Sequence, residues 1–320
     1  MAEDLGRAGP EGVLVPELVP SRARMRTTIA RFLRSDAPGA VGLVVIAVMV
    51  FIVIFGVMIT PYTKDQIFTE VNPEYDPRST SPGALAETRS AFLAGPSWDH
   101  WLGTDTKGRD LLTRLMYGSR ISVSIGVGAA FFGVLAGSII GLTSGFAGGK
   151  VDLVIQRLVD AMIAFPGLLL LLLIVQVGER SYTLTLLALS VGVTFGSSRI
   201  VRAATMKTRG ETYVEAARAM GASKMRVVLR HVLPNIVDPI IIIFSISIGA
   251  NILAEASLAF LNLSVPGPSW GQIVNEGRAF LDSKPLMSVS AGLAITIVVL
   301  SFNVVGDSVR DWLDPHQRAR

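Results

Sequence analysis

The chain has 320 residues, 50% of them hydrophobic and 17% charged, and because its mean hydropathy is +0.53 we expect lipid to be the solvent for much of it. It contains no cysteine, which excludes disulfides and thiolate metal sites, and its three histidines (His100, His231 and His316) are too scattered to form a ligand cluster. The net charge is +4, but the basic residues flank apolar segments without interleaved aromatic residues, which argues against nucleic-acid binding.

The N-terminal segment, residues 1–39, is expected to lie in the cytoplasm. Between Arg24 and Arg34 the apolar residues alternate with arginines, which predicts a short helix in the membrane interface, with a disordered basic tail as the alternative. The first predicted span, residues 40–59, contains an uninterrupted apolar run from Val41 to Ile59, about long enough to cross the hydrocarbon core. A long polar segment precedes this run and no small-residue cleavage site follows it, so we expect a retained anchor.

Positive charge is concentrated before the first span and between the fourth and fifth, so the positive-inside rule places both segments in the cytoplasm. Residues 60–117 then form an extracytoplasmic loop, residues 118–306 the rest of the membrane core, and residues 307–320 a cytoplasmic tail. The sequence therefore predicts an all-α integral membrane protein with six spans and both termini cytoplasmic. The five further spans are predicted at Ile121–Ser144, Asp152–Val177, Tyr182–Ser198, Ile236–Ala256 and Ser288–Gly306.

Small residues recur every fourth position along the second span and so form one ridge on a helix. Glycine costs about 1 kcal/mol relative to alanine in a helix interior, so this register indicates close packing against another helix. The partner helix can belong to this chain or to another. The ridge consists of Ala129, Gly133, Gly137, Gly141, Gly145 and Gly149.

Polar residues also occur inside the predicted spans. Asp152, Gln156 and Asp160 follow one another at i, i+4 and i+8, and a carboxylate at mid-membrane costs about 2.5–3.5 kcal/mol, so this face should meet protein or water. It lines a translocation path or forms a structural ion pair with Arg157 or Arg199. The same question applies to Glu255, Asn303 and Asp307, and Pro166 should loosen the third span at its middle.

The loop between the fourth and fifth spans, residues 199–235, is unusually ordered. Good helix formers from Tyr213 to Met220 end at Gly221, a natural left-handed stop. Ser223 can cap a following basic helix that closes at Leu233 and Pro234. The small residues of the first helix suit a cleft in another protein, and an amphipathic loop on lipid headgroups is the alternative.

These loop residues resemble the EAA signature of ABC importer permeases. Glu215-Ala216-Ala217 is followed after three residues by Gly221 and after nine more by His231-Val232-Leu233-Pro234. The resemblance implies a type I importer permease fold in which this helix docks on an ATPase subunit. The ATPase-coupling residues that it implies are Glu215, Ala216, Ala217, Gly221, Leu233 and Pro234.

Further stretches resemble the C-type subunit of dipeptide, oligopeptide and nickel importers. They are Leu102 to Asp110, Glu255 to Leu261 followed by Pro268-Ser269-Trp270-Gly271, and Phe302 to Asp307 followed by Leu313-Asp314-Pro315. Asn262 and Ser264 stand where this family usually has glycine. The first outer stretch is expected to position the permease beneath the binding protein, with pairing of Asp105 to Arg109 and Asp110 to Arg114. Its motif residues are Gly103, Thr104, Asp105, Gly108, Arg109 and Asp110.

The resemblance implies a pore-forming subunit of an ATP-driven peptide importer. Its partners would be a homologous second permease, two ATPase subunits or domains that bind ATP and Mg, and an extracytoplasmic binding protein. Gly149-Lys150 lacks a Walker A context, so we expect this chain to have no ATPase activity of its own. Nickel, glutathione and haem are alternative cargoes, and a channel outside the ABC family is the alternative class. Candidate path residues are Gln156, Asp160, Glu255 and Asn303.

Overall fold

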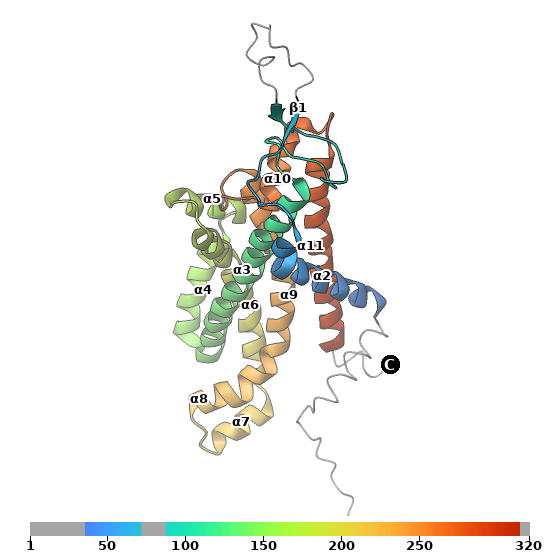
Figure 1. Cartoon of the computed structure of the whole chain (residues 1–320). Coiled ribbons are helices and arrows are strands. Elements are labelled where there is room, and N and C mark those ends of the chain that lie inside the picture. Colours follow the sequence, from blue (N-terminus) through green and yellow to red (C-terminus); the bar gives the residue numbers. More distant parts are fainter. Residues whose placement is uncertain (1–35, 72–87, 314–320) are drawn as a thin grey trace, which may run out of the picture.

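The computed structural model describes residues 36–71 and 88–313. The predicted interfacial helix between Arg24 and Arg34 and the Asp314-Pro315 ending lie outside these residues. The long helices are α2 (Ala37–Ile59), α3 (Leu111–Ala147), α6 (Tyr182–Arg209), α9 (Val237–Phe260) and α11 (Leu286–Leu313). The shorter ones are α4 (Gly149–Ile163), α5 (Gly167–Val177), α7 (Thr212–Ala219), α8 (Lys224–Val227) and α10 (Trp270–Gly277). A small antiparallel hairpin, β1 (Thr69–Val71) and β2 (Thr88–Ser90), extends the outer loop (Figure 1).

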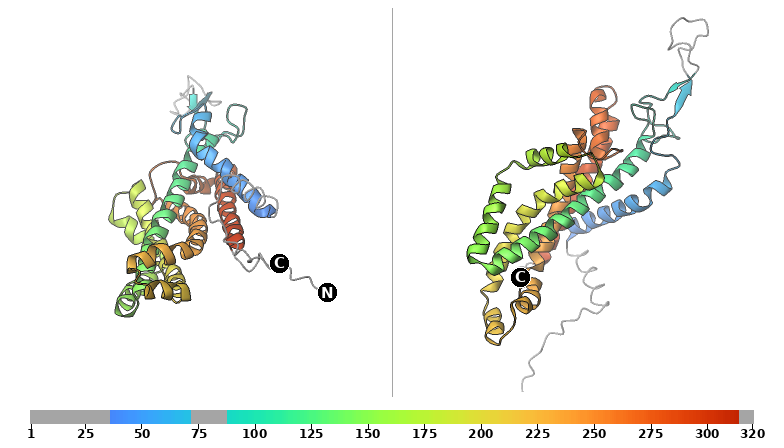
Figure 2. Two further views of the ribbon diagram at one scale, coloured as in Figure 1. Left: turned by 90° about the horizontal axis from the view of Figure 1, so that it is seen from below. Right: turned by 90° about the vertical axis from the view of Figure 1, so that its left-hand side faces the viewer.

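Within the described residues, five helical stretches are long and apolar enough to span a membrane, and the α4–α5 pair supplies a sixth if it is counted as one span. The axes of α4 and α5 differ by 87°. Pro166, which cannot donate a backbone hydrogen bond, precedes the first residue of α5. The expectation that this proline only loosens a continuous span was therefore wrong, because the helix ends and restarts there. In the right view of Figure 2, α4 and α5 form a bent arm beside α3 and α6.

The glycine ridge of α3 packs against α6 of the same chain. A Cβ added to Gly133 would lie 2.7 Å from the carbonyl oxygen of Ser190, and one added to Gly145 would lie 2.8 Å from that of Arg202. The absence of side chains on α3 therefore permits the backbone of α6 to approach closely. Contrary to the prediction, Gly149 does not continue the ridge, because it starts α4 with a φ of +56° and a Cβ there would meet nothing within 4 Å.

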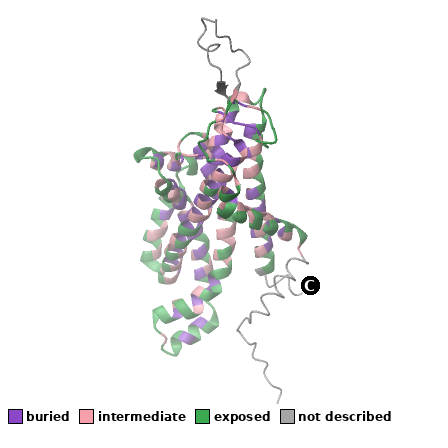
Figure 3. Ribbon diagram, in the orientation of Figure 1, coloured by how far each residue is buried: buried purple, intermediate pink, exposed green. Residues whose placement is uncertain are grey.

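The remaining helices surround this pair. Glycines also bring α2 against its neighbours, since Gly39 and Gly42 lie against α11 and Gly56 lies against Met116 of α3. Trp270, at the start of α10, is fully buried and donates its indole N–H to the carbonyl oxygen of Leu115, 3.0 Å away. Figure 3 shows buried residues concentrated near the axis of the bundle, whereas most of α2 and α4 is exposed or half-buried. Those surfaces are left for lipid or for another chain.

Candidate functional site

The loop between α6 and α9 folds into α7 and α8, which lie beyond the ends of the long helices in Figure 1. Gly221 follows α7 with a φ of +85°, and the Ala222 N–H bonds to the carbonyl oxygen of Ala217 at 3.1 Å. The hydroxyl of Ser223 accepts a hydrogen bond from the Arg226 N–H and starts α8. The predicted left-handed stop and the predicted cap are both confirmed.

One face of α7 is anchored inside the chain. Val214 and Ala217 are buried, and Val214 joins a hydrophobic cluster with Val201 of α6 and with Val227, Val232 and Ile236. Ala217 therefore does not present its methyl group to a partner, and a bulky residue there would first disturb the loop itself. The exposed residues of α7 and its end include Tyr213, Glu215, Ala216 and Met220. These side chains form the surface that another protein can contact.

The helix after α7 does not close at Leu233 and Pro234, contrary to the prediction. The chain continues from α8 through a π-helical turn (Val228–Val232) and a 3-10 turn (Leu233–Ile236) into α9. The change of helix type accommodates Pro234, which cannot donate in a regular α-helix. The side-chain amide of Asn235 donates to the carbonyl oxygen of His231 at 2.7 Å. One helical stretch, Lys224–Phe260, thus connects α7 to the outer end of α9.

The extracytoplasmic motif forms a buried charge network centred on Asp105. Its carboxylate accepts hydrogen bonds from the Arg109 Nε at 2.7 Å and from the Arg114 Nη1 at 2.6 Å, and Arg114 also bonds to Glu276 of α10 at 2.6 Å. The predicted Asp105–Arg109 pair is confirmed, but the Asp110–Arg114 pair was wrong. Asp110 instead caps α3 through the Thr113 N–H at 2.8 Å and contacts the His100 Nδ1 at 2.9 Å.

The glycines of this motif allow backbone conformations and close backbone contacts that a side chain would prevent. Gly103 and Gly108 have φ values of +79° and +76°, and a Cβ on Gly108 would lie 2.9 Å from the carbonyl oxygen of Phe68. The hydroxyl of Thr104, which is buried, donates to the carbonyl oxygen of Ala91. The motif therefore fastens the outer loop to α3 and α10, and most of its side chains are not available for direct contact with another protein.

Glu255 anchors the segment after α9. It is fully buried, it accepts a hydrogen bond from the Ser264 hydroxyl at 2.9 Å, and the hydroxyls of Ser122 and Ser269 lie beside it. Asn262 has a φ of +59°, a left-handed conformation that asparagine tolerates better than most residues. The two departures from the family pattern thus fit this turn, because asparagine adopts the conformation expected of glycine and Ser264 supplies a hydrogen bond.

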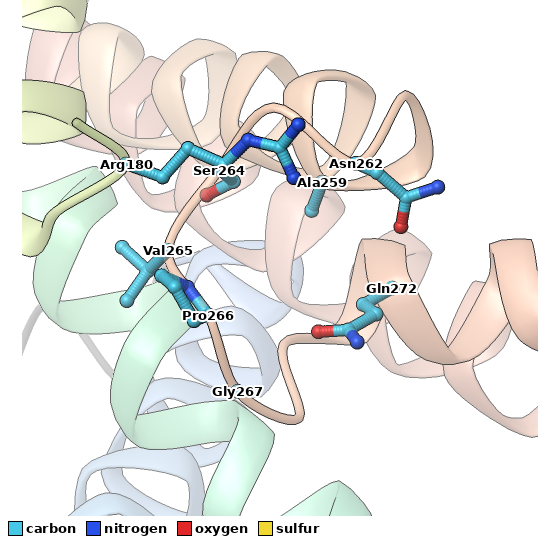
Figure 4. Close-up of a pocket in the computed structure, with 8 residues that line it drawn as sticks. All are labelled: Arg180, Ala259, Asn262, Ser264, Val265, Pro266, Gly267 and Gln272. Carbon is cyan, nitrogen blue, oxygen red and sulfur yellow. The ribbon is translucent and has the colours of Figure 1, made fainter. Parts of the chain in front are cut away.

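A cavity of about 220 Å³ with both polar and apolar walls lies at this outer end (Figure 4). Arg180, from the turn between α5 and α6, extends toward Asn262, and Gln272 of α10 lies across the opening. These side chains can bind carboxylate or amide groups. The sequence motifs did not predict a role for Arg180, although a basic residue in a short outer turn was an available signal.

Two ion pairs attach α4 to α6. Arg202 binds Asp152 through its Nε and Nη2 atoms at 2.6 and 2.5 Å, and Arg199 binds Asp160 at 2.5 Å. Gln156 donates to the Ser144 hydroxyl at 2.9 Å. The ion-pair alternative for Asp160 is confirmed with Arg199. The partner of Asp152 was not foreseen, although Arg202 follows Arg199 by three residues and so lies on the same helix face.

The candidate path residues do not form one group. Asp160 and Arg199 are each 48% exposed on the isolated chain, whereas Glu255 is fully enclosed by it. Asn303 is half-buried on α11, where its side-chain oxygen faces Gly249 of α9. Of these side chains, only the Asp160–Arg199 pair presents formal charge on a surface that a second chain or water can cover.

Known proteins resemble this chain over most of its length. Residues 133–319 match the family described as binding-protein-dependent transport system inner membrane component, and residues 25–82 match the N-terminal TM domain of oligopeptide transport permease C. The dipeptide transport system permease protein DppC of Alkalihalophilus pseudofirmus is 35% identical over 90% of this chain and 88% of its own length. The glutathione transport system permease protein GsiD of Pectobacterium atrosepticum is 35% identical over 89% of each chain.

The fold also resembles a solved transporter. A chain of the MetNI methionine ABC transporter in an inward-facing conformation superposes with a TM-score of 0.54 and 19% identity, over 64% of this chain and 96% of that one. At this identity the likeness concerns the fold alone.

Proposed function

This chain belongs to the family of binding-protein-dependent transport system inner membrane components, and from that premise we propose that it is a pore-forming subunit of an ATP-driven importer of di- or oligopeptides. The observation that carries the proposal is the attachment of α7. Its inner face is packed against α6 and the base of α9, and its outer face is exposed. A force applied to α7 by another protein is therefore passed to two membrane-spanning helices.

We assign the driving force to partner subunits. Two ATPase subunits or domains bind ATP and Mg and contact the exposed face of α7, while this chain does not hydrolyse ATP. A homologous second permease covers the exposed sides of α4 and α6, and an extracytoplasmic binding protein delivers the substrate to the opposite end. The chain lies in a bacterial inner membrane with α7 and both termini in the cytoplasm, a placement supported by the basic residues of the α6–α9 loop.

We place the substrate path next to the Asp160–Arg199 pair. A half-exposed ion pair within spanning helices is costly in hydrocarbon, so its exposed side should meet water or a second permease subunit. The same charges can interact with the terminal groups of a peptide. Glu255 and Asn303 are instead assigned to holding α9 and its outer turn in place, because both lie within the packing of this chain.

Glutathione is a second candidate cargo, favoured by the 35% identity to the glutathione permease. The decisive experiment is reconstitution of the complete complex with its binding protein in liposomes. Peptide uptake that requires both ATP and the binding protein would support the proposal, and uptake that continues without ATP would contradict it. Mass spectrometry of ligands bound to the purified binding protein would then separate peptides from glutathione.

A further inference from the structure

A cleft of about 800 Å³ lies between the end of α3 and the α7–α8 segment. Its walls are mostly apolar and include Leu142, Phe146, Val228 and Leu229. Small-molecule sites in proteins usually have volumes of roughly 300–1,000 Å³, so the cleft is large enough for a ligand. Of the exposed residues of α7, Glu215 and Ala216 do not line the cleft, whereas Arg218 does.

The charged residues that line the cleft are all basic: Arg209, Arg218 and Lys224. Arg209 donates to the carbonyl oxygen of Phe146 at 2.9 Å, and the guanidinium of Arg218 lies 5.4 Å from the centre of the Phe146 ring. Within residues 36–71 and 88–313, none of the three has a carboxylate partner. Three cations around an apolar cleft are complementary to an amphiphile that carries negative charge.

The position of the cleft bears on where such an amphiphile would come from. It lies at the end of α3, just beyond the predicted second span Ile121–Ser144, and therefore close to the level of a membrane surface. Met225 and Leu229, one helical turn apart at its edge, are 67% and 54% exposed. Exposed apolar side chains next to basic ones, at the end of spanning helices, are suited to lipid headgroups and acyl chains.

We propose that this cleft binds an anionic phospholipid from the adjacent leaflet. The lipid phosphate contacts Lys224 and Arg218, and an acyl chain lies along Leu142, Val228 and Leu229. Bound in this way, the lipid connects the end of α3 to the segment that carries α7. The site requires only that the cleft is at a membrane surface, so it does not depend on the identity of the transported substrate.

The test is native mass spectrometry of the intact transporter complex titrated with phosphatidylglycerol or with phosphatidylcholine of the same acyl chains. We expect phosphatidylglycerol to be retained preferentially. Because a basic residue near a membrane surface contributes about 1 kcal/mol, Lys224→Gln and Arg218→Gln should each weaken retention about fivefold. Leu229→Ser should weaken it through the acyl chain. The matched control is Arg226→Gln, which removes a cation from the same short helix but does not line the cleft.

Four outcomes would overturn the proposal. The first is equal retention of the two lipids, and the second is an equal loss of retention in Arg226→Gln and Lys224→Gln, which would indicate only general attraction to anionic lipid. The third is displacement of the lipid by excess inorganic phosphate, which would assign the site to a free anion. Loss of the ATPase subunits from the Lys224→Gln complex with unchanged lipid binding would assign the cations to a protein contact. Substrate uptake is measured separately, so failure here leaves the transport function untouched.

Discussion

Asp105 and Arg114 form an ion pair with 2.6 Å between the carboxylate and guanidinium atoms, and their side chains are only 0% and 2% exposed. The pair joins the outer loop to the first turns of α3, and Glu276 extends it to α10. Removing one member of a buried pair leaves the other charge without compensation, which typically destabilises a protein by about 3–5 kcal/mol. The pair therefore holds the outer segments in one arrangement.

We predict that Asp105→Asn lowers the stability of the purified complex by about 3 kcal/mol or more, because two arginines lose their shared carboxylate. Thermal unfolding in detergent measures this effect. The control is Asp65→Asn, which removes an exposed pair with Lys64 at 3.8 Å and should change stability by less than about 1 kcal/mol. Equal effects of the two substitutions would contradict the role assigned to the network.

The α3–α6 contact gives a second prediction. Gly141→Ala would force its methyl group against the Ser198 carbonyl oxygen and the Arg202 N–H, and overpacking of this kind costs about 1–3 kcal/mol. Gly292→Ala on α11 meets nothing within 4 Å in this chain and should be neutral or stabilising. The yield and thermal stability of the assembled complex compare the two. A harmless alanine at Gly141 would mean that the helices do not pack as described.

The spans and the glycine ridge could be predicted from the sequence because both depend on local patterns. Apolar run length identifies a span, and the spacing of the glycines shows that they share a helix face. Which helix packs against the ridge depends on the tertiary arrangement of the later helices, and no local sequence pattern specifies that arrangement. The break at Pro166 was located correctly but underestimated, since a proline shows where hydrogen bonding fails and not by how much the following helix turns.

The end of α7 and the start of α8 could be predicted from the sequence, because Gly221 and Ser223 act on adjacent residues. The direction in which the side chain of Ala217 points could not be predicted, because this direction depends on the hydrophobic cluster that α7 forms with α6 and the base of α9. The partners of the charged side chains were not fully predictable from the sequence either. Asp110 lies four residues before Arg114, as an intrahelical pair requires, but it is the residue that caps α3, so its carboxylate bonds to the Thr113 N–H.

The orientation of the chain can be tested with single cysteines, because the natural sequence has none. Lys64→Cys in the outer loop and Arg226→Cys in α8 both replace exposed residues. In intact cells, an impermeant thiol reagent should label the first variant and not the second, and permeabilisation should expose both. The reverse pattern would place α7 outside the cell and remove the proposed contact with ATPase subunits.

The Asp160–Arg199 pair yields a prediction that separates a structural role from a place in the path. The exchange Asp160→Arg with Arg199→Asp preserves an ion pair between α4 and α6 but inverts the charges presented on their exposed side. We expect assembly to be retained while ATP-dependent uptake of peptides falls at least severalfold. Full uptake by the exchanged protein, combined with loss of assembly in Asp160→Ala, would show that the pair is structural only.

The coupling function of α7 can be tested with two neighbouring alanines, because Ala216 is exposed and Ala217 is buried. Ala216→Leu should leave the loop folded but hinder docking of α7 on the ATPase subunits. Substrate uptake and the stimulation of ATP hydrolysis by the binding protein should then fall together. Ala217→Leu should disturb the loop and increase its proteolysis.

Gly221→Ala adds about 1–2 kcal/mol of backbone strain at a φ of +85°, with no steric clash, and should shift the start of α8. Glu215→Ala removes an exposed acidic group from α7 and should weaken binding of the ATPase subunits without unfolding the loop. Uptake and binding-protein-stimulated hydrolysis are measured on reconstituted complexes, and proteolysis reports the state of the loop. Wild-type coupling in both Ala216→Leu and Glu215→Ala would show that the exposed face of α7 does not contact the ATPase, and the loop would then be better described as resting on lipid headgroups.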